Sequence, residues 1–205
     1  MLIIEKNAVY EVDCECLQKK RGRYANLTCE ERQIEKEQII VPTGGVCKES
    51  LSYTGKGVTV AILDTGLYPH PDFKDRIVGW YDAIGHEAYP VDPNGHGTHV
   101  AGIIAGDGTL SGGHIQGIAP QAFIVSVRVL DAHGKGRLSA MLEGIRWLKE
   151  NGKRLGIQIV NISVGSVKKQ KENSQLVQAV ESLWDSGLVI CSAAGNEGMQ
   201  QHNIT

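Results

Sequence analysis

VTVAILDTG, at residues 58–66, is a short apolar and β-branched run that stops at an aspartate, a threonine and a glycine. Such a run is typical of a strand that is buried on both faces of a parallel sheet. Three later runs have the same character, so we expect strands at Val58–Leu63, Phe123–Leu130, Ile157–Ile162 and Leu188–Ala194. Asp64 then follows the first strand directly, at the edge of the sheet where the sites of open α/β proteins gather.

Segments with helical periodicity separate these expected strands. Apolar residues recur every three to four positions in Ser139–Asn151 and Ser174–Trp184, and each segment starts at a serine that can cap a helix. The small, apolar segment His96–Ala105 is expected to be a third helix. Because strands and helices alternate, we predict an α/β fold with right-handed crossovers and a mostly parallel sheet.

The first 50 residues differ in composition from the rest of the chain. They carry 17 charged side chains, whereas residues 51–205 carry 27 over three times the length. A segment this polar buries little apolar surface by itself. We therefore predict a charged N-terminal extension or short pro-segment at residues 1–50 and a folded domain at residues 51–205.

The overall charge and hydropathy favour some partners and exclude others. A net charge of −2 without a polybasic run predicts no nucleic acid partner. No stretch approaches 18 consecutive apolar residues, so we expect no membrane span. The N-terminus turns charged at Glu5, before the apolar region of a signal peptide could form, which predicts a cytoplasmic protein. The five cysteines match no zinc spacing and are expected to be reduced thiols.

Four motifs follow one another in a characteristic order. They are Ala61–Gly66, His96–Gly102, Asn161–Gly165 and Ala193–Gly198. They resemble the aspartate, histidine, substrate-strand and asparagine motifs of the subtilisin-like serine proteases, or subtilases. This resemblance implies the three-layer subtilisin-like fold, with helices on both faces of the sheet, and a serine endopeptidase of the peptidase S8 type. It also implies that the domain at residues 51–205 is incomplete and lacks its C-terminal part.

The resemblance assigns three catalytic roles. It implies that His96 is the general base, that Asp64 is the acid that orients it, and that Asn196 donates a hydrogen bond to the oxyanion. These residue types suit the chemistry, because a serine hydroxyl becomes nucleophilic only when a base takes its proton, and a buried carboxylate holds the imidazole in the productive tautomer. Without the motifs around them, Asp64 would be a turn residue at a strand end, His96 an ordinary histidine and Asn196 a turn asparagine.

A polypeptide substrate is the partner that the resemblance implies. In subtilases the substrate lies as an added strand between two strands of the enzyme, which residues 135–137 and 163–165 resemble. Gly136 and Gly165 would leave room for the substrate backbone. The matching positions, which plain packing would also explain, are Gly136, Leu138, Ser163, Val164, Gly165, Ala194 and Gly195. Their small and apolar side chains favour a substrate with large apolar residues.

No metal or cofactor is expected, except for a weak calcium site as an alternative. His99 follows His96 at the i, i+3 spacing of some metal ligands, but the resemblance favours packing or hydrogen bonding for it. Asp72 matches a calcium ligand of many subtilases. The partner loop at residues 106–114 lacks the usual ligand pattern, and calcium takes six to eight oxygens. We therefore predict no strong calcium site.

The nucleophile of a serine protease is missing from the motifs of this chain. None of its eleven serines stands in a Gly-Thr-Ser or Gly-x-Ser-x-Gly string. Ser163 belongs to the substrate segment and Ser192 to an expected strand, so neither is expected to replace it. We predict that the 205 residues alone hydrolyse no peptides, and that an incomplete domain exposes apolar surface and self-associates.

Two other functions are compatible with parts of the sequence. A non-catalytic protein could keep the groove and bind peptides without cleaving them. A different α/β enzyme, such as a nucleotide-binding one, is disfavoured because no Gly-x-Gly-x-x-Gly or Gly-x₄-Gly-Lys-Ser/Thr loop follows a strand.

Overall fold

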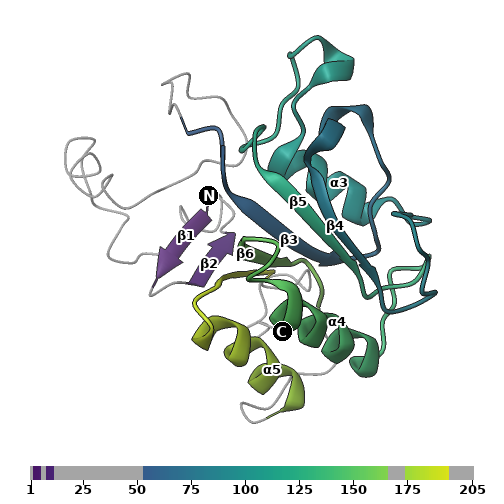
Figure 1. The fold of residues 1–205 in the computed structure, drawn as a ribbon, viewed down its shortest axis with the longest axis vertical. Helices are drawn as coiled ribbons and strands as arrows, with labels where there is room; N and C mark the ends of the chain where they lie inside the picture. Colours follow the sequence, from purple (N-terminus) through teal and green to yellow (C-terminus); the bar gives the residue numbers. More distant parts are fainter. Residues whose placement is uncertain (1, 6–7, 12–52, 166–173, 194–205) are drawn as a thin grey trace, which may run out of the picture.

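The computed structural model describes residues 2–5, 8–11, 53–165 and 174–193. Within these residues the strands form one sheet in the order β1-β2-β7-β6-β3-β5-β4 (Figure 1). Its main part consists of five parallel strands: β3 (Thr59–Asp64), β4 (Ile77–Asp82), β5 (Phe123–Arg128), β6 (Ile157–Ile162) and β7 (Val189–Ser192). Strand β3 pairs with β5 on one side and β6 on the other, so Asp64 ends a strand inside the sheet.

The four expected strands are confirmed, and three others were missed: β4 and the first two strands of the chain. Strand β4 forms the edge of the sheet beside β5, and its register shifts between Ile77 and Gly79. This irregularity and the glycine interrupt the apolar pattern by which strands are recognised in a sequence. The expected strand at 123–130 ends earlier, at Arg128, because the chain turns there. The N–H groups of Val129 and Leu130 both donate to the Asp64 carbonyl, at 2.9 and 3.2 Å.

A hairpin from the start of the chain extends the sheet. Strands β1 (Leu2–Glu5) and β2 (Ala8–Glu11) pair in antiparallel fashion, and β2 lies parallel to β7. Residues 12–52 lie outside the described residues. The division at residue 50 therefore stays a prediction, although the first strands share the sheet of the main domain.

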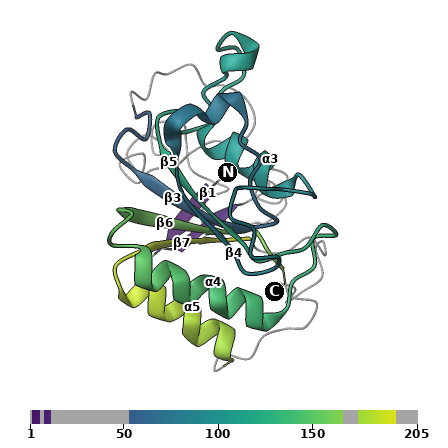
Figure 2. The same ribbon diagram turned by 45° about the vertical axis from the view of Figure 1, so that its right-hand side comes forward.

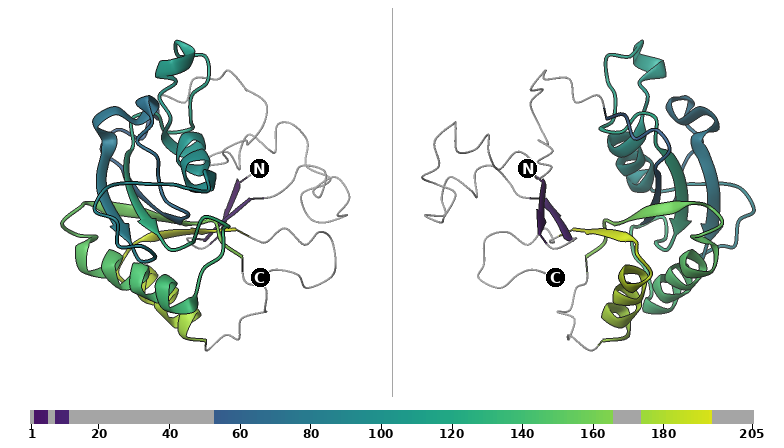
Figure 3. Two further views of the ribbon diagram at one scale, coloured as in Figure 1. Left: turned by 90° about the vertical axis from the view of Figure 1, so that its right-hand side faces the viewer. Right: turned by 60° about the vertical axis from the view of Figure 1, so that its left-hand side comes forward.

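Helices cover both faces of the sheet, as predicted (Figures 2 and 3). Helix α3 (His96–Ala105) packs on one face, and α4 (Leu138–Asn151) and α5 (Gln175–Asp185) pack on the other. Successive residues of β3 alternate between the two cores: Ala61 and Leu63 join the cluster under α4 and α5, whereas Val60 and Ile62 join the cluster under α3. The observed architecture is therefore the three-layer α/β fold that the sequence predicted.

The predicted helix starts were right at one helix and wrong at another. Ser174 caps α5, and its Oγ accepts a hydrogen bond from the Val177 N–H at 3.3 Å. Ser139 was expected to cap α4, but the observed cap residue is Arg137, which makes no side-chain cap bond, and the helix begins at Leu138. Ser139 instead lies in the first turn, so the predicted cap was two residues too late.

The domain also contains two short 3₁₀ helices that contact each other. They are η2 (Pro71–Arg76) and η3 (Thr109–Ser111). None of the helices in the described residues has the length and apolar character that crossing a membrane requires.

Candidate active site

Asp64 and His96 are 32 residues apart in sequence, and the fold brings their side chains into contact. The Nδ1 atom of His96 lies 2.7 Å from Oδ1 of Asp64. The Asp64 side chain is fully buried, whereas the His96 side chain is 49% exposed. The predicted acid and base are therefore neighbours, with the acid shielded and the base open to solvent.

The contact determines which nitrogen of His96 carries a proton. An ionised carboxylate only accepts hydrogen bonds, so Nδ1 must donate to it. In the neutral imidazole, Nε2 then has a free lone pair. Asp64 Oδ1 is held in place by a second donor, the backbone N–H of Thr65 at 2.7 Å. This arrangement is the one that a general base requires, because the lone pair of Nε2 is the atom that takes up a proton.

Close packing between β3 and α3 allows this contact. His96 is the first residue of α3, and Gly97 follows it. A Cβ atom on Gly97 would lie 2.2 Å from the carbonyl oxygen of Gly66 and 3.1 Å from the Cβ of Asp64. Only glycine fits at this position, so the glycine in the histidine motif sets the short distance between the helix and the end of β3.

Asp92 connects the two elements, and the sequence analysis missed it. Its carboxylate accepts hydrogen bonds from the Thr65 hydroxyl, the Gly95 N–H and both the N–H and the hydroxyl of Thr98. Burial alone would raise the pKa of Asp92, but these hydrogen bonds outweigh burial and hold the pKa below its usual value. An aspartate four residues before His96, just ahead of a helix start, was the signal that could have identified it.

A second buried carboxylate lies in the same row of the sheet. Asp64, Arg128 and Asp82 are register partners at the ends of β3, β5 and β4. The Nη1 atom of Arg128 donates to Oδ2 of Asp82 at 3.0 Å, and backbone N–H groups from residues 84, 85 and 87 supply the other donors. Burial works to raise the pKa of Asp82, but the N–H groups and the guanidinium hold it below its usual value.

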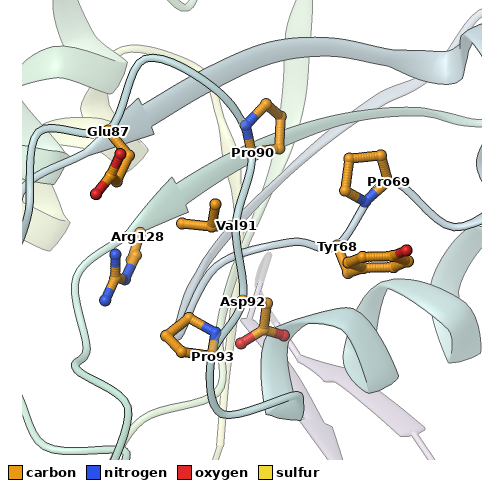
Figure 4. Close-up of a pocket in the computed structure, with 8 residues that line it drawn as sticks. All are labelled: Tyr68, Pro69, Glu87, Pro90, Val91, Asp92, Pro93 and Arg128. Carbon is orange, nitrogen blue, oxygen red and sulfur yellow. The ribbon is translucent and has the colours of Figure 1, made fainter.

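An open hollow of about 510 Å³ adjoins this row (Figure 4). Its walls are mainly apolar and proline-rich, with two carboxylates and a guanidinium among them. The lining residues are Tyr68, Pro69, Glu87, Pro90, Val91, Asp92, Pro93 and Arg128.

The sequence profile of the Subtilase family (peptidase S8) matches residues 55–205. The chain belongs to the subtilase family. It is 42% identical over 165 residues to serine protease AprX of Bacillus subtilis (strain 168), and the aligned region covers 78% of this chain and 37% of AprX. It is 41% identical over 145 residues to thermitase of Thermoactinomyces vulgaris, and that aligned region covers 70% of this chain and 49% of thermitase.

A solved structure agrees with these sequence relatives. The crystal structure of a cold adapted subtilisin-like serine proteinase superposes with a TM-score of 0.61 at 34% sequence identity, covering 72% of this chain and 50% of that chain. The subtilase chain described here thus spans no more than half the length of each of these three proteins.

The two predicted substrate segments of the subtilase are not strands. Residues 135–137 and 163–165 have no regular structure and lie just before α4 and just after β6. Gly136 was expected to leave room for a substrate backbone. A Cβ atom there would instead lie 2.6 Å from Leu130 Cδ2 and 2.7 Å from the Val129 carbonyl oxygen. The glycine at this position is therefore required by the packing of the chain against itself.

The other predicted substrate residues are placed as follows. Leu138 is 49% exposed at the first residue of α4. Val164 is half-buried and packs against the core under α4 and α5, and the Ser163 hydroxyl accepts a hydrogen bond from the Asn161 amide at 2.7 Å. Gly165 is exposed. Asn196, Ala194 and Gly195 lie outside the described residues, and the roles of all these positions stay predictions.

No serine in the described part of the chain contacts the base. None of the hydroxyls there makes a hydrogen bond to His96, and Ser192 instead donates to the carbonyl of the next residue at 3.4 Å. Within the described residues the pair of Asp64 and His96 is therefore an acid and a base without a serine partner.

The carboxylates of Asp72 and of the neighbouring Asp107 have partners within the protein, and the absence of a strong calcium site stays a prediction. An Asp72 carboxylate oxygen accepts the Leu110 N–H at 2.8 Å. The neighbouring Asp107 forms an ion pair with Lys74 at 3.0 Å. Burial opposes ionisation of Asp107, but hydrogen bonds from Thr109 and Lys74 lower its pKa to about 2. The described residues contain no cluster of three or more histidine, cysteine or acidic side chains that could hold a metal, and His99 is exposed.

Proposed function

We propose that this chain supplies the general base and the orienting acid of a serine endopeptidase that hydrolyses peptide bonds. The observation that carries the proposal is the 2.7 Å contact between His96 Nδ1 and the fully buried Asp64. A histidine oriented by a carboxylate and exposed at its other nitrogen can take the proton of a serine hydroxyl and return it to a leaving amine.

The proposed roles follow from this geometry and from the family. His96 Nε2 accepts the proton of the nucleophile, and Asp64 stabilises the imidazolium that forms without itself becoming protonated. Asn196 is proposed to donate to the oxyanion of the tetrahedral intermediate, a contribution of about 3–4 kcal/mol in the transition state. The polypeptide substrate is proposed to contact the segments around Gly136 and Ser163, with Leu138 lining a subsite.

The 205 residues contain no nucleophile motif, so we propose that they do not hydrolyse peptides unaided. Incubation with a fluorophosphonate probe, followed by intact mass measurement, tests this point. We expect the mass to remain near 22.2 kDa. A single adduct would contradict the proposal and would identify an activated serine.

Peptide hydrolysis itself is testable by complementation. A segment of serine protease AprX that carries its nucleophile would be mixed with this chain, and turnover of a fluorogenic polypeptide would be measured in fractions where the two pieces co-elute. We expect turnover that is abolished by His96→Ala and kept in His99→Ala, because His99 lies outside the pair. Co-eluting pieces without turnover, or turnover that survives His96→Ala, would contradict the proposed role.

The missing motif also favours a second candidate, a non-catalytic peptide-binding protein. Binding of a labelled unfolded polypeptide by this chain alone would distinguish the two. If the chain is a binding protein, it should bind the polypeptide as a stable monomer and give no turnover in the complementation assay. The cytoplasmic location and the self-association expected from the sequence remain predictions.

A further inference from the structure

We infer that Asp92 is a positioning residue that holds both partners of the Asp64–His96 pair through one carboxylate. Its Oδ1 accepts from the Thr65 hydroxyl at 2.8 Å and from the Gly95 N–H at 2.9 Å. Its Oδ2 accepts from the Thr98 N–H at 2.8 Å and from the Thr98 hydroxyl at 2.5 Å. The catalytic meaning of this inference rests on the proposed function.

On the side of the acid, Asp92 acts through Thr65. Thr65 follows Asp64 in sequence, is itself buried, and gives its N–H to Asp64 Oδ1 at 2.7 Å. Because the Thr65 hydroxyl donates to Asp92, its lone pairs are free to accept the Gly97 N–H at 2.9 Å. Thr65 thus joins the end of β3 to the first turn of α3, and Asp92 orients the hydroxyl that makes this link.

On the side of the base, Asp92 holds the residues that flank His96. The first turn of a helix has N–H groups without partners in the helix. Gly95, the cap residue of α3, has no side chain to satisfy them. Asp92 accepts the N–H groups of Gly95 and Thr98, one before His96 and one two residues after it. The backbone that carries the imidazole is therefore tied to the same carboxylate as the acid.

All four groups that face Asp92 are donors, which requires the ionised form of its side chain. The network of hydrogen bonds that lowers the pKa of Asp92 keeps this form present at neutral pH. Figure 4 shows Asp92 beside the start of α3. Buried networks of this kind position their members strongly when every member is satisfied.

The test is the variant Asp92→Asn, read out at His96 by NMR of ¹⁵N-histidine-labelled protein. Asparagine keeps the size of the side chain but replaces one acceptor oxygen by an NH₂ group. This NH₂ group then faces N–H or O–H donors and cannot accept their hydrogen bonds. We expect the low-field Nδ1–H resonance of His96 to exchange with solvent about tenfold faster, which corresponds to about 1.4 kcal/mol. The matched control is Asp107→Asn, because Asp107 likewise accepts the N–H and the hydroxyl of one threonine, Thr109, and lies beyond the end of α3 that is opposite His96.

A second pair of variants keeps the test decisive if Asp92→Asn does not fold. Thr65→Val removes the hydroxyl that joins Asp92 to the end of β3 and keeps the branched shape, whereas Thr65→Ser keeps the hydroxyl. We expect faster exchange at His96 in Thr65→Val and rescue in Thr65→Ser. This pattern would support a positioning role through the network.

An unchanged His96 resonance in folded Asp92→Asn, with only a lower melting temperature, would overturn the inference and make Asp92 an ordinary helix cap. The same holds if Thr65→Val and Thr65→Ser give equal exchange rates. A wild-type chain whose neutral His96 carries its proton on Nε2 would instead contradict the proposed function itself, so the two failures are distinguishable.

Discussion

The ends of β3 and β4 each carry a fully buried aspartate, and the two carboxylates have different partners. Asp82 accepts three backbone N–H groups and the guanidinium of Arg128, so all its donors are fixed. Asp64 accepts one backbone N–H and the imidazole of His96, a group that can gain and lose a proton. The comparison teaches that a buried carboxylate becomes chemically useful when its main partner is titratable and exposed.

The largest effect should come from breaking the fixed pair. Asp82→Ala leaves Arg128 buried without its partner, and removing one member of a buried ion pair costs about 3–5 kcal/mol. Urea denaturation followed by circular dichroism measures this loss. Asp131→Ala, at a partly buried loop position, is the control and should cost far less. If Asp82→Ala lowers the free energy of unfolding by less than about 1 kcal/mol, the Arg128 guanidinium must bind another group or reach water in the variant, which would contradict the role of the pair.

The second effect concerns the approach of α3 to Asp64. Gly97→Ala places a Cβ atom 2.2 Å from the Gly66 carbonyl oxygen, so the helix must move away. We expect a loss of about 1–3 kcal/mol in the free energy of unfolding, together with a weaker Asp64–His96 bond. Gly102→Ala in the same helix meets no atom within 4 Å and is the matched control. Equal effects of the two substitutions would contradict the role of close packing.

The pH dependence of stability tests the fixed carboxylate, Asp82. The pKa of Asp82 is lower in the folded protein than its ordinary value of 3.8. Its contribution is therefore present above that ordinary value and is lost as the pH falls through the lower, folded-state pKa. In urea titrations at decreasing pH, wild type should lose stability in this range more steeply than Asp82→Asn. The depressed pKa values of Asp92, Asp107 and Asp131 add to the loss in both proteins. Parallel curves would show that Asp82 gains nothing from its partners.

The smallest effect on stability is expected at the proposed subsite. Leu138 is 49% exposed, so Leu138→Ala should change the free energy of unfolding by less than about 0.5 kcal/mol. If Leu138 lines a subsite, the same substitution should weaken binding of a peptide with large apolar side chains. A clear loss of stability would show that Leu138 serves packing instead.

The periodicity of the sequence predicted four strands of the sheet and the helices, and the resemblance to the subtilases implied the pairing of Asp64 with His96. The elements that carry the pair have strong patterns: β3 is a continuous apolar run, and α3 begins at His96. Strand β4 was missed because its glycine and register shift break the pattern.

Asp92 was missed although Gly95 and Thr98, two of its partners, lie within six residues of it, because its position ahead of α3 was not read as a helix-start signal. The pair of Asp82 and Arg128 was missed for a different reason, since the two residues are 46 positions apart in the sequence. Such contacts leave no periodic trace in a sequence. The same limit explains Gly136, whose neighbours Val129 and Leu130 become evident only when the chain turns around the end of β3.

The central claim is that Asp64 fixes the proton of neutral His96 on Nδ1. The most direct measurement is the tautomer of His96 by ¹⁵N NMR, above the pH at which the imidazole titrates, in wild type and in Asp64→Asn. We expect the proton on Nδ1 in wild type. In Asp64→Asn we expect it on Nε2, because the amide NH₂ group can donate to Nδ1. A wild-type proton on Nε2, or the same tautomer in both proteins, would contradict the assignment of His96 as base and Asp64 as its orienting acid.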